Sequence, residues 1–373
     1  MIGQRRIRHY TLLAVLHFAF IHSAFGDDVL RIVEVSVDGS QVRLTYPAEE
    51  GYYYVLDRGD TVEVIAEAID LAKDSNTELT DREGTERKQA YYRVRKIATE
   101  DSLDIDGDGI KDVDELDYPG VVDPLEPRDA DLDFDNDGKT NKQELNNPSG
   151  ATDPGDAVFE NVAFKTADDF NIAASLGVPT TLNPSMPAVI FIHQGGATRR
   201  EWQSVAKQAF REGWVTLAYD IRGHGASSGR WTNAWYDDPD NAPEDVKAAI
   251  KYVKGLTNVE GDRIAVVGAS VGGNLACVAS ALYEVKTAVA ISHKTSAVFN
   301  LAGEDSLQFR SIYHLAAEGD QSGQRKRWAT ELFEQTSEPK KLEITKGSGH
   351  GVAIFNTDRT VPDRIVQWLR DTL

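Results

Sequence analysis

Residues 157–373 alternate short apolar runs with segments in which apolar positions recur every three or four residues. The short runs predict buried strands, and the longer segments predict amphipathic helices. This alternation is typical of a mostly parallel α/β domain of some 217 residues. The expected strands are 188–192, 214–219, 264–267, 287–291 and 341–345, and the expected helices are 201–212, 242–255, 273–282 and 364–371.

Residues 27–98 follow a different pattern, in which apolar and polar positions alternate with a period of two. The runs 31–37 and 41–46 flank Asp38-Gly39-Ser40, which predicts a β-hairpin. Further strands are expected at 52–57, 61–66 and 90–97, enough for a small β-sandwich module. Two interpretations stay open for tyrosines 52–54, 91 and 92: packing in the sandwich, which we favour, or contact with a glycan or cell surface.

Between these regions, residues 99–156 carry 19 acidic and 4 basic side chains, a net charge of −15 out of −20 for the whole chain. Two twelve-residue loops place acidic or amide side chains at positions 1, 3, 5, 9 and 12, with Gly109 or Gly138 at position 6. The first loop has Asp104, Asp106, Asp108, Asp112 and Glu115. The second has Asp133, Asp135, Asp137, Asn141 and Glu144.

This spacing suits a hard cation, because alternate carboxylates converge as the loop curls and the glycine permits a sharp turn. The alternative is a solvated acidic linker without a metal. Prolines 119, 124 and 127 interrupt the helices that paired EF-hands require, so the segment resembles thrombospondin type 3 calcium repeats more than EF-hands. The resemblance implies bound calcium (Ca2+) with a structural, non-catalytic role.

The rest of the chain is close to neutral, and the sequence has no basic stripe of the kind that binds nucleic acid. Residues 1–26 combine Arg5, Arg6 and Arg8 with a short apolar stretch and a small-residue cleavage pattern, which predicts a signal peptide and a secreted or periplasmic protein. An uncleaved N-terminal anchor is the alternative. We expect no transmembrane segment in the mature chain, and the single Cys277 excludes an intrachain disulfide.

The candidate chemistry centres on Gly268-Ala269-Ser270-Val271-Gly272, a G-x-S-x-G pentapeptide. An apolar strand precedes it, and a small-residue helix follows. Strand, tight turn and helix in this order predict a nucleophile elbow, in which Ser270 is the nucleophile and the Val271 N–H is one oxyanion donor.

With this elbow, the chain resembles the α/β-hydrolase superfamily, in particular dienelactone-hydrolase-like and esterase–lipase-like serine esterases. The resemblance implies the order nucleophile, acid, histidine along the chain. It assigns His350, in Gly347-Ser-Gly-His-Gly351, as the base and Asp320 as the acid, with Glu318 as the alternative acid.

The same resemblance covers His193-Gln194-Gly195-Gly196, which is similar to the family's oxyanion loop and implies Gly195 as the second donor, with Gln194 and Gly196 as alternatives. The chain departs from the family at Gln194, where many members have glycine. Asp220-Ile-Arg-Gly-His-Gly-Ala-Ser227 also matches a family segment, and we expect a structural role for it rather than His224 as the base.

Together these features predict an exported serine hydrolase that cleaves carboxylic esters on small molecules or polymers through an acyl-enzyme, without an organic cofactor. The connections at 230–243 and 292–313 are short, so we expect a small lid over an open cleft. The alternatives are a serine peptidase of the same fold and an inactive binding or adhesion protein.

Overall fold

The structure is a computed structural model that describes residues 32–61, 65–73, 76–84, 89–183 and 185–373. These residues form two compact units. The first comprises the described residues up to Asp117 together with Asp123–Pro127, and the second comprises Tyr118–Val122 and Arg128–Leu373. The acidic segment is therefore divided: its first loop belongs to the first unit and its second loop to the second. The expected signal peptide at 1–26 lies outside the described residues.

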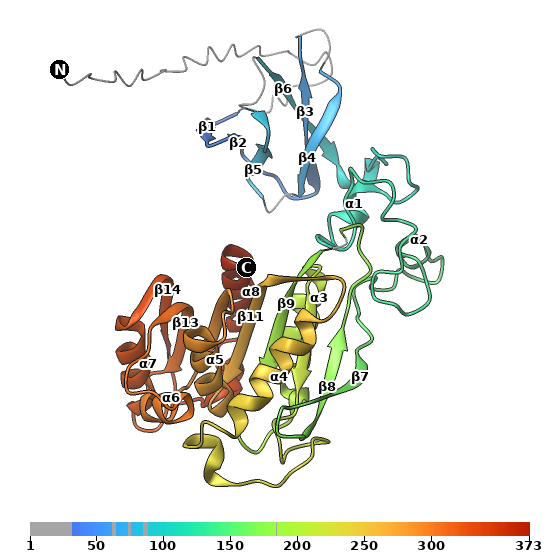
Figure 1. The fold of residues 1–373 in the computed structure, drawn as a ribbon. Coiled ribbons are helices and arrows are strands. Elements are labelled where there is room, and N and C mark those ends of the chain that lie inside the picture. The colour runs from blue at the N-terminus through green and yellow to red at the C-terminus, as the bar shows by residue number, and fades with distance from the viewer. Residues whose placement is uncertain (1–31, 62–64, 74–75, 85–88, 184) are drawn as a thin grey trace, which may run out of the picture. The chain divides into compact units, whose positions relative to one another are not determined.

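The first unit contains two three-stranded antiparallel sheets (Figure 1). One sheet has the order β1 (Glu34–Asp38), β2 (Gln41–Thr45), β5 (Glu78–Asp81), and the other β4 (Glu67–Lys73), β3 (Tyr52–Gly59), β6 (Tyr91–Ala98). Side chains of β2, such as Leu44, and of β3, such as Tyr54, share one buried core. The two sheets therefore pack as a sandwich.

The predicted strands match β1, β2, β3 and β6, with shifted ends. The strand expected at 61–66 falls partly on residues 62–64, which lie outside the described residues, and the strand that follows is β4 at Glu67–Lys73. Tyr53 and Tyr54 are fully buried, as core packing requires, whereas Tyr52, Tyr91 and Tyr92 are partly exposed.

The second unit is built on an eight-stranded sheet in the order β14-β13-β12-β11-β9-β10-β8-β7. The six strands from β14 to β10 are parallel, and β8 and β7 continue the sheet antiparallel. The strands are β7 (Glu160–Lys165), β8 (Asn171–Gly177), β9 (Met186–Ile192), β10 (Val215–Tyr219), β11 (Val259–Ala269), β12 (Thr287–Ile291), β13 (Phe309–Ala317) and β14 (Thr336–Thr345).

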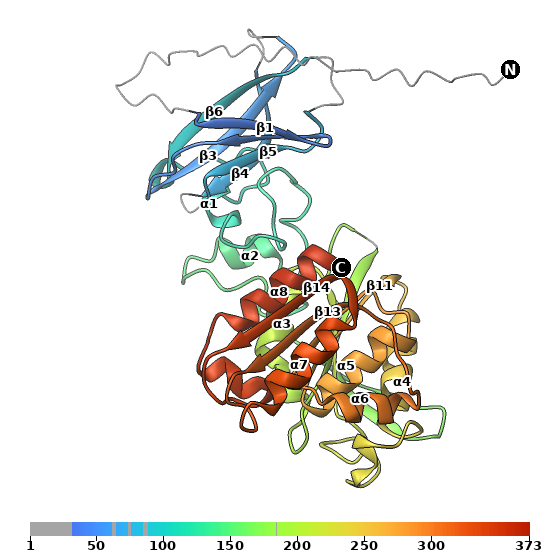
Figure 2. The same ribbon diagram turned by 90° about the vertical axis from the view of Figure 1, so that its left-hand side faces the viewer.

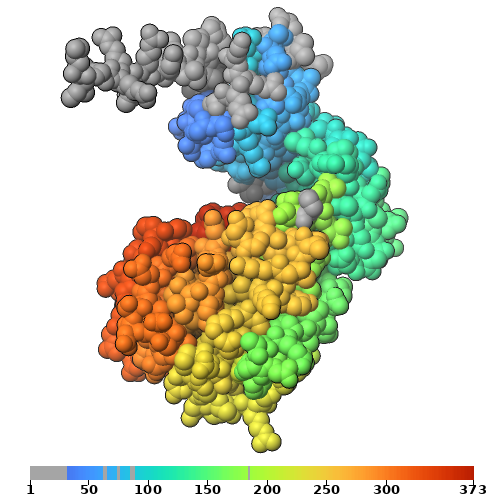
Figure 3. All heavy atoms as spheres, in the orientation of Figure 1, coloured from blue at the N-terminus to red at the C-terminus, as the bar shows by residue number. Residues whose placement is uncertain are grey.

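Helices cover both faces of this sheet, because successive side chains of a strand point to opposite sides. In β9, Ile190 joins the core under α4 (Ala242–Lys254) and α5 (Val271–Leu282), whereas Val189 joins the core under α3 (Gln203–Arg211) and α8 (Val361–Thr372). Figure 2 shows these two helix layers. Figure 3 shows the outer surface of the α4–α5 layer in yellow and orange.

Two helices that the sequence pattern did not indicate, α6 (Thr295–Ala302) and α7 (Gln324–Glu334), complete the α4–α5 layer. Cys277 lies on α5, fully buried, and burial raises the pKa of its thiol. Within the part of the chain that the structure describes, no helix is both long and apolar enough to span a bilayer.

The strand order reverses around β9, which has β10 on one side and β11 on the other. In open α/β sheets, loops at the carboxyl ends of the strands beside such a reversal diverge and leave a crevice for ligands. The topology therefore directs attention to the loops after β9 and β11, which carry Gly195 and Ser270.

Candidate active site

Ser270 occupies a strained turn between β11 and α5, with φ 52° and ψ −109°. Its N–H donates to Ile291 O at 2.8 Å, and its carbonyl accepts the N–H of Asn274 at 2.9 Å. A positive φ in a non-glycine residue costs about 1–3 kcal/mol and persists only where the surroundings enforce it. This turn is the predicted strand–turn–helix elbow.

The two flanking glycines are required by close backbone contacts. A Cβ at Gly268 would lie 2.1 Å from Gly272 O, and a Cβ at Gly272 would lie 2.2 Å from Ile192 O. Since real Cβ atoms do not approach so closely, any side chain at either position would displace the elbow. Gly272 also brings the end of β9, where the loop of Gly195 begins, against the elbow.

A hydrogen-bonded chain links Ser270, His350 and Asp320. Ser270 Oγ lies 2.8 Å from His350 Nε2, and His350 Nδ1 lies 3.0 and 2.9 Å from the two carboxylate oxygens of Asp320. Asp320 is buried, whereas the His350 side chain is 36% exposed. A proton on Nδ1 that is donated to Asp320 leaves the Nε2 lone pair free to accept the Ser270 hydroxyl proton.

The alternative acid, Glu318, is exposed, and its carboxylate accepts the Gly347 N–H instead. One residue that the sequence did not single out joins the chain: the Ser292 hydroxyl lies 2.7 Å from Asp320 Oδ2. No motif marks Ser292, because its place beside Asp320 arises only when β12 and β13 pair.

In the loop after β9, hydrogen bonds fix the His193 ring and the backbone N–H groups of Gln194 and Gly196. Ile221 N–H donates to His193 Nε2 at 2.9 Å, so the ring proton is on Nδ1 and is donated to Gln194 O at 2.8 Å. Gln194 N–H donates to Glu201, and Gly196 N–H donates to His224 Nε2. Because C=O and N–H of one trans peptide point in opposite directions, the Gly195 N–H points away from His193.

The other expected donor, Val271, is the first residue of α5. The first N–H groups of a helix have no intrahelical acceptor and attract negative charge. Gly195 thus lies in the loop after β9 and Val271 at the start of α5, and the close approach of Gly272 to Ile192 O brings these two segments together.

The connection from β10 to α4 packs over the Gly195 loop. Its short helix η4 (Asn233–Tyr236) is anchored by Trp235, which is buried, with its ring centroid 3.9 Å from that of His224. Tyr236 reaches Gly195: a Cβ on this glycine would lie 3.0 Å from the tyrosine hydroxyl oxygen. Trp231 and Tyr236 remain 56% and 36% exposed.

The Asp220–Ser227 segment makes structural contacts. The Asp220 carboxylate pairs with Arg199 and accepts the Ala226 N–H at 2.9 Å. The buried Arg222 donates to Asp245 at 2.8 Å and to Asp168 at 2.6 Å. His224 Nε2 accepts the Gly196 N–H at 3.3 Å, whereas the imidazole that contacts Ser270 Oγ is that of His350.

Each acidic loop gathers three carboxylates. Oxygens of Asp104, Asp106 and Asp108 lie within 4.8 Å of one another, and so do those of Asp133, Asp135 and Asp137. Backbone N–H groups of the loops hold them there; for example, Gly107 N donates to Asp104 and Gly138 N to Asp133. The clusters form in the curled geometry that a hard cation needs.

The residues at position 9 make hydrogen bonds that close the loops. Asp112 accepts the Ile105 N–H at 2.8 Å and the Tyr53 hydroxyl at 2.9 Å. Asn141 accepts the Phe134 N–H at 3.3 Å and donates to Asp129 O at 2.8 Å. Each of these side chains accepts a backbone N–H from the start of its own loop, a role that an amide oxygen can fill as well as a carboxylate oxygen.

The residues at position 12 are buried, and they differ in their contacts. A Glu115 oxygen lies within 4.8 Å of one of Asp108. Glu144 accepts the Thr152 hydroxyl with Oε1, while its Oε2 is buried without a hydrogen-bond partner. Burial, reinforced by neighbouring carboxylates, raises the pKa of Asp106 and that of Asp135 to about 6 each. Uncompensated oxygens of this kind fit a bound cation.

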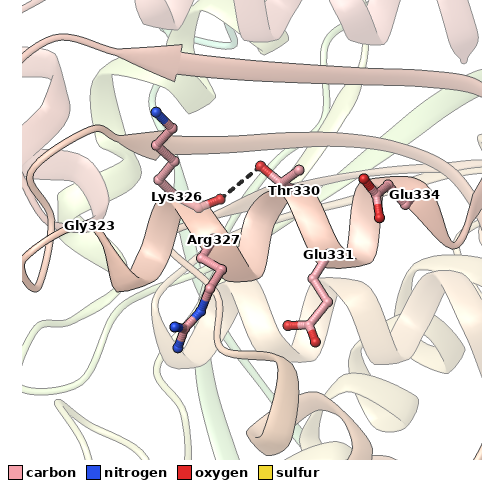
Figure 4. A pocket seen from close by; sticks show the side chains of 6 residues that line it. All are labelled: Gly323, Lys326, Arg327, Thr330, Glu331 and Glu334. Carbon is pink, nitrogen blue, oxygen red and sulfur yellow. Dashed lines mark hydrogen bonds between the residues drawn. The ribbon is translucent and has the colours of Figure 1, made fainter.

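A separate hollow lies on the outer face of α7 (Figure 4). It is lined by Gly323, Lys326, Arg327, Thr330, Glu331 and Glu334. None of the residues around Ser270 contributes to it, and the Thr330 hydroxyl within it donates to Lys326 O at 3.0 Å. It has no part in the site described above.

With this geometry established, comparison with known proteins gives a consistent result. The family model for the alpha/beta hydrolase fold matches residues 187–335, a range that includes Ser270 and Asp320 but ends before His350. The quorum-quenching protein AidA of Acinetobacter baumannii is 32% identical over 108 residues, 29% of this chain and 34% of its own length. An uncharacterized protein of Pseudomonas aeruginosa is 32% identical over 162 residues, 42% of this chain and 43% of its own length.

The chain thus spans less than half the length of these relatives. Among solved structures, an esterase of Pyrococcus furiosus is 19% identical, with a TM-score of 0.46 over 58% of this chain and 93% of its own. An esterase of Pyrobaculum calidifontis is 18% identical, with a TM-score of 0.46 over 57% of this chain and 85% of its own. The family match and the mostly parallel sheet agree: the second unit has the alpha/beta hydrolase fold.

Proposed function

We propose that the protein is a serine hydrolase that cleaves carboxylic esters through a covalent acyl-enzyme. The observation that carries the proposal is the unbroken hydrogen-bonded chain from Ser270 Oγ through His350 to the buried Asp320. A free serine hydroxyl is not ionised at neutral pH, so it needs a base aligned in this way to become nucleophilic.

In the first step, Ser270 Oγ attacks the ester carbonyl carbon while its proton passes to His350 Nε2. Asp320 holds the imidazole in the correct tautomer and stabilises the imidazolium that forms. The tetrahedral intermediate collapses when His350 returns the proton to the leaving alkoxide. Water, deprotonated by His350, then attacks the acyl-enzyme, and the proton returns to Ser270 Oγ as the acid leaves.

The negative oxygen of each tetrahedral intermediate would be bound by the N–H groups of Val271 and Gly195. Support comes from the occupied neighbours, since Gln194 N–H and Gly196 N–H already have acceptors. A single oxyanion donor typically contributes about 10²–10³-fold to kcat. Tyr236 borders this loop, and Trp231 packs against Trp235 in the same connection. The partial exposure of Trp231 and Tyr236 favours an accessible cleft, which suits an ester on a small molecule or a polymer.

Turnover of short-chain p-nitrophenyl esters tests the proposal. Ser270→Ala and His350→Ala should each lower kcat by at least about 1,000-fold, because the members of such a unit act together. Ser348→Ala is the matched control: this serine is exposed and lies two residues from His350, and the variant should keep full activity. Labelling of Ser270 by a fluorophosphonate should be lost only in Ser270→Ala and His350→Ala.

The same assays separate the alternatives. Faster turnover of peptide p-nitroanilides than of esters would favour a serine peptidase. If calcium-loaded protein turned over no ester, amide or acetylated glycan and Ser270 resisted fluorophosphonate, the protein would be an inactive binding protein. The likeness to AidA adds no substrate, because the alignment spans 34% of that relative.

We further propose that each acidic loop binds one structural calcium ion. In the first loop Asp104, Asp106, Asp108, Asp112 and Glu115 would supply oxygens, and in the second Asp133, Asp135, Asp137, Asn141 and Glu144. The position-9 residues, Asp112 and Asn141, would act through a bound water. The proposal is supported by the converged carboxylates and by the buried, partnerless oxygens Asp106 Oδ2 and Glu144 Oε2, which are costly to leave uncompensated.

Isothermal titration calorimetry of chelator-treated protein should give two calcium ions per chain. Asp106→Asn and Asp135→Asn should each reduce this number to one. Asp131→Asn removes the same charge from an exposed neighbouring position and should leave two ions bound. Equal weakening by all three variants would indicate diffuse attraction to the acidic segment instead of two sites.

The last proposal concerns location. The basic and apolar pattern of residues 1–26 supports export with cleavage after Gly26. Expression of the full chain in a bacterial host, followed by N-terminal sequencing of periplasmic protein, should find Asp27 as the first residue. Protein retained in the membrane fraction with an intact N-terminus would favour the anchor.

A further inference from the structure

Ser292 is held in an unusual conformation at the end of β12, the strand beside β11 and its elbow. It is fully buried and has a positive φ of 51°, close to that of Ser270. Its N–H donates to Leu315 O at 2.8 Å, and its carbonyl accepts from Arg325 Nη1 at 2.7 Å. Contacts to β13 and α7 therefore enforce a backbone conformation that a serine would otherwise avoid.

The direction of the Ser292 hydroxyl is determined by its two neighbours. Gly351 N–H lies 3.0 Å from Ser292 Oγ, and a backbone N–H can only donate. The hydroxyl oxygen is therefore the acceptor of that bond, and its own proton is donated to Asp320 Oδ2 at 2.7 Å. One hydroxyl thus joins the acid to the residue that follows His350.

His293, the residue after Ser292, is held by a chain of hydrogen bonds that runs through His314 to Thr336. Thr336 donates its hydroxyl to Leu332 O, so it accepts from His314 Nε2; His314 Nδ1 then accepts from His293 Nε2 at 2.9 Å. Burial lowers the pKa of both histidines, which keeps them neutral and this order of protons intact. The backbone at 292–293 consequently has little freedom to move relative to Asp320.

We propose that Ser292 is a positioning residue of the reaction, acting through Asp320 and the His350 loop. Its donated hydrogen bond keeps the carboxylate facing His350 Nδ1 with both oxygens, and its accepted bond holds Gly351 so that His350 Nε2 stays over Ser270. By withdrawing charge from Asp320, it also moderates how strongly the acid stabilises the imidazolium. This inference rests on the proposed serine-hydrolase function.

Ser292→Ala tests it, since alanine keeps the backbone cost of a positive φ and removes only the hydroxyl. We expect kcat for p-nitrophenyl butyrate to fall about 10–100-fold with KM changed less than twofold, because the bond acts on the reacting groups and not on substrate binding. The acidic limb of the kcat/KM profile should move to higher pH, since an Asp320 deprived of a donor favours protonated His350 more strongly.

Ser311→Ala is the matched control. Ser311 is also a buried serine with a positive φ of 47°. Its hydroxyl donates to Thr287 Oγ1 at 2.8 Å, at the start of β12 and thus at the opposite end of that strand from Ser292. This variant should leave kcat and the pH profile unchanged. Ser292→Ala with kcat within twofold of the parent, or with a lower rate and an unmoved acidic limb, would overturn the proposal.

The pKa of His350, followed by NMR titration of its ring proton, gives a readout that needs no substrate. It should rise in Ser292→Ala and stay constant in Ser311→Ala. If the parent protein hydrolysed no ester but the His350 pKa still responded to Ser292→Ala, the proposed function would fail while the positioning role stood. An unchanged His350 pKa would reject that role whether or not esters are cleaved.

Discussion

At the scale of single residues, backbone N–H groups fix which side-chain atoms at the site donate hydrogen bonds and which accept them. Ile221 N–H fixes the tautomer of His193, and Gly351 N–H fixes the direction of the Ser292 hydroxyl. Because backbone donors and acceptors cannot exchange roles, the side chains beside them cannot either. The arrangement around Ser270 therefore forms without a ligand, which would reduce the reorganisation that the proposed reaction requires.

The partly buried carboxyl of Glu201 should make the stability of the protein depend on pH. Its carboxylate accepts the Gln194 N–H at 2.6 Å, and burial raises its pKa from 4.5 to about 7. A raised folded-state pKa means that the stabilising effect of the protonated form is complete below pH 4.5 and is lost as the pH rises through 7. Glu201→Gln keeps an acceptor for Gln194 without the charge, so its melting temperature should exceed the parent's at pH 8 by roughly 2–4 °C.

The difference between the Glu201→Gln variant and the parent should shrink or change sign at pH 5, where the parent carboxyl is largely protonated. Circular dichroism melts at pH 5, 6, 7 and 8 measure it. Glu304→Gln, at an exposed position, is the control and should show a small difference that does not depend on pH. A pH-independent difference for Glu201→Gln would contradict the raised pKa.

The residues at the site differ in how visible they are in the sequence. Ser270 stands in a motif, and His350 and Asp320 follow in the order that the motif implies, so all three could be named before the structure was seen. Ser292 and Glu201 stand in no motif. They become neighbours of Asp320 and Gln194 only because strand pairing and the turn into α3 bring them there.

At the scale of elements, the loop after β10 is tied to α4 by a buried ion pair. Asp245, in the first turn of α4, accepts from Arg222 Nε at 2.8 Å and from its backbone N–H at 2.9 Å. Asp168 completes the shell of Arg222 from a position that is 37% exposed. The segment for which the sequence predicts a structural role therefore fixes the start of the connection from β10 to α4.

Asp245→Ala should destabilise the second unit by about 3–5 kcal/mol, because it leaves the Arg222 guanidinium buried with one partner fewer. Asp168→Ala removes the exposed partner and should cost about 1 kcal/mol or less. The midpoints of urea unfolding, monitored by tryptophan fluorescence, measure both values. Equal losses for the two variants would mean that burial of Asp245 has no special role.

Several elements were not predicted, for identifiable reasons. β13 contains Arg310, Ser311 and His314, which break the apolar pattern of a buried strand; the latter two are buried because Thr287, His293 and Thr336 supply hydrogen bonds. The outer face of α7 is so polar that no apolar stripe stands out, although Leu332 and Ala329 are buried. A local hydrophobic pattern cannot predict the burial of polar residues whose hydrogen-bond partners lie far away in the sequence.

At the scale of the whole molecule, the acidic segment belongs to both units. The loop of Asp104–Glu115 is part of the first and the loop of Asp133–Glu144 part of the second. In the second unit, Phe134 packs against Phe210 of α3 with ring centroids 5.3 Å apart, and Arg211 pairs with Asp153. Each loop is therefore coupled to the core of its own unit.

This division predicts that calcium stabilises each unit through its own loop. All six tryptophans lie at or beyond Trp202, so their fluorescence reports unfolding of the second unit. Calcium at 100 times its dissociation constant should stabilise this unit by about 2.7 kcal/mol. Asp135→Asn should abolish the gain in the fluorescence melt, whereas Asp106→Asn, which removes the same charge from the first loop, should preserve it.

Labelling of the single, buried thiol of Cys277 can report unfolding of the second unit. A thiol reagent cannot reach a side chain sealed inside α5 until the surrounding helices and sheet separate, so labelling counts opening events, one per molecule. Native protein should stay unlabelled by Ellman's reagent for as long as the proposed esterase activity persists, and denatured protein should react with one equivalent. Rapid labelling of active protein would refute this. Time courses of labelling and of activity in a single sample then separate chemical inactivation from loss of structure.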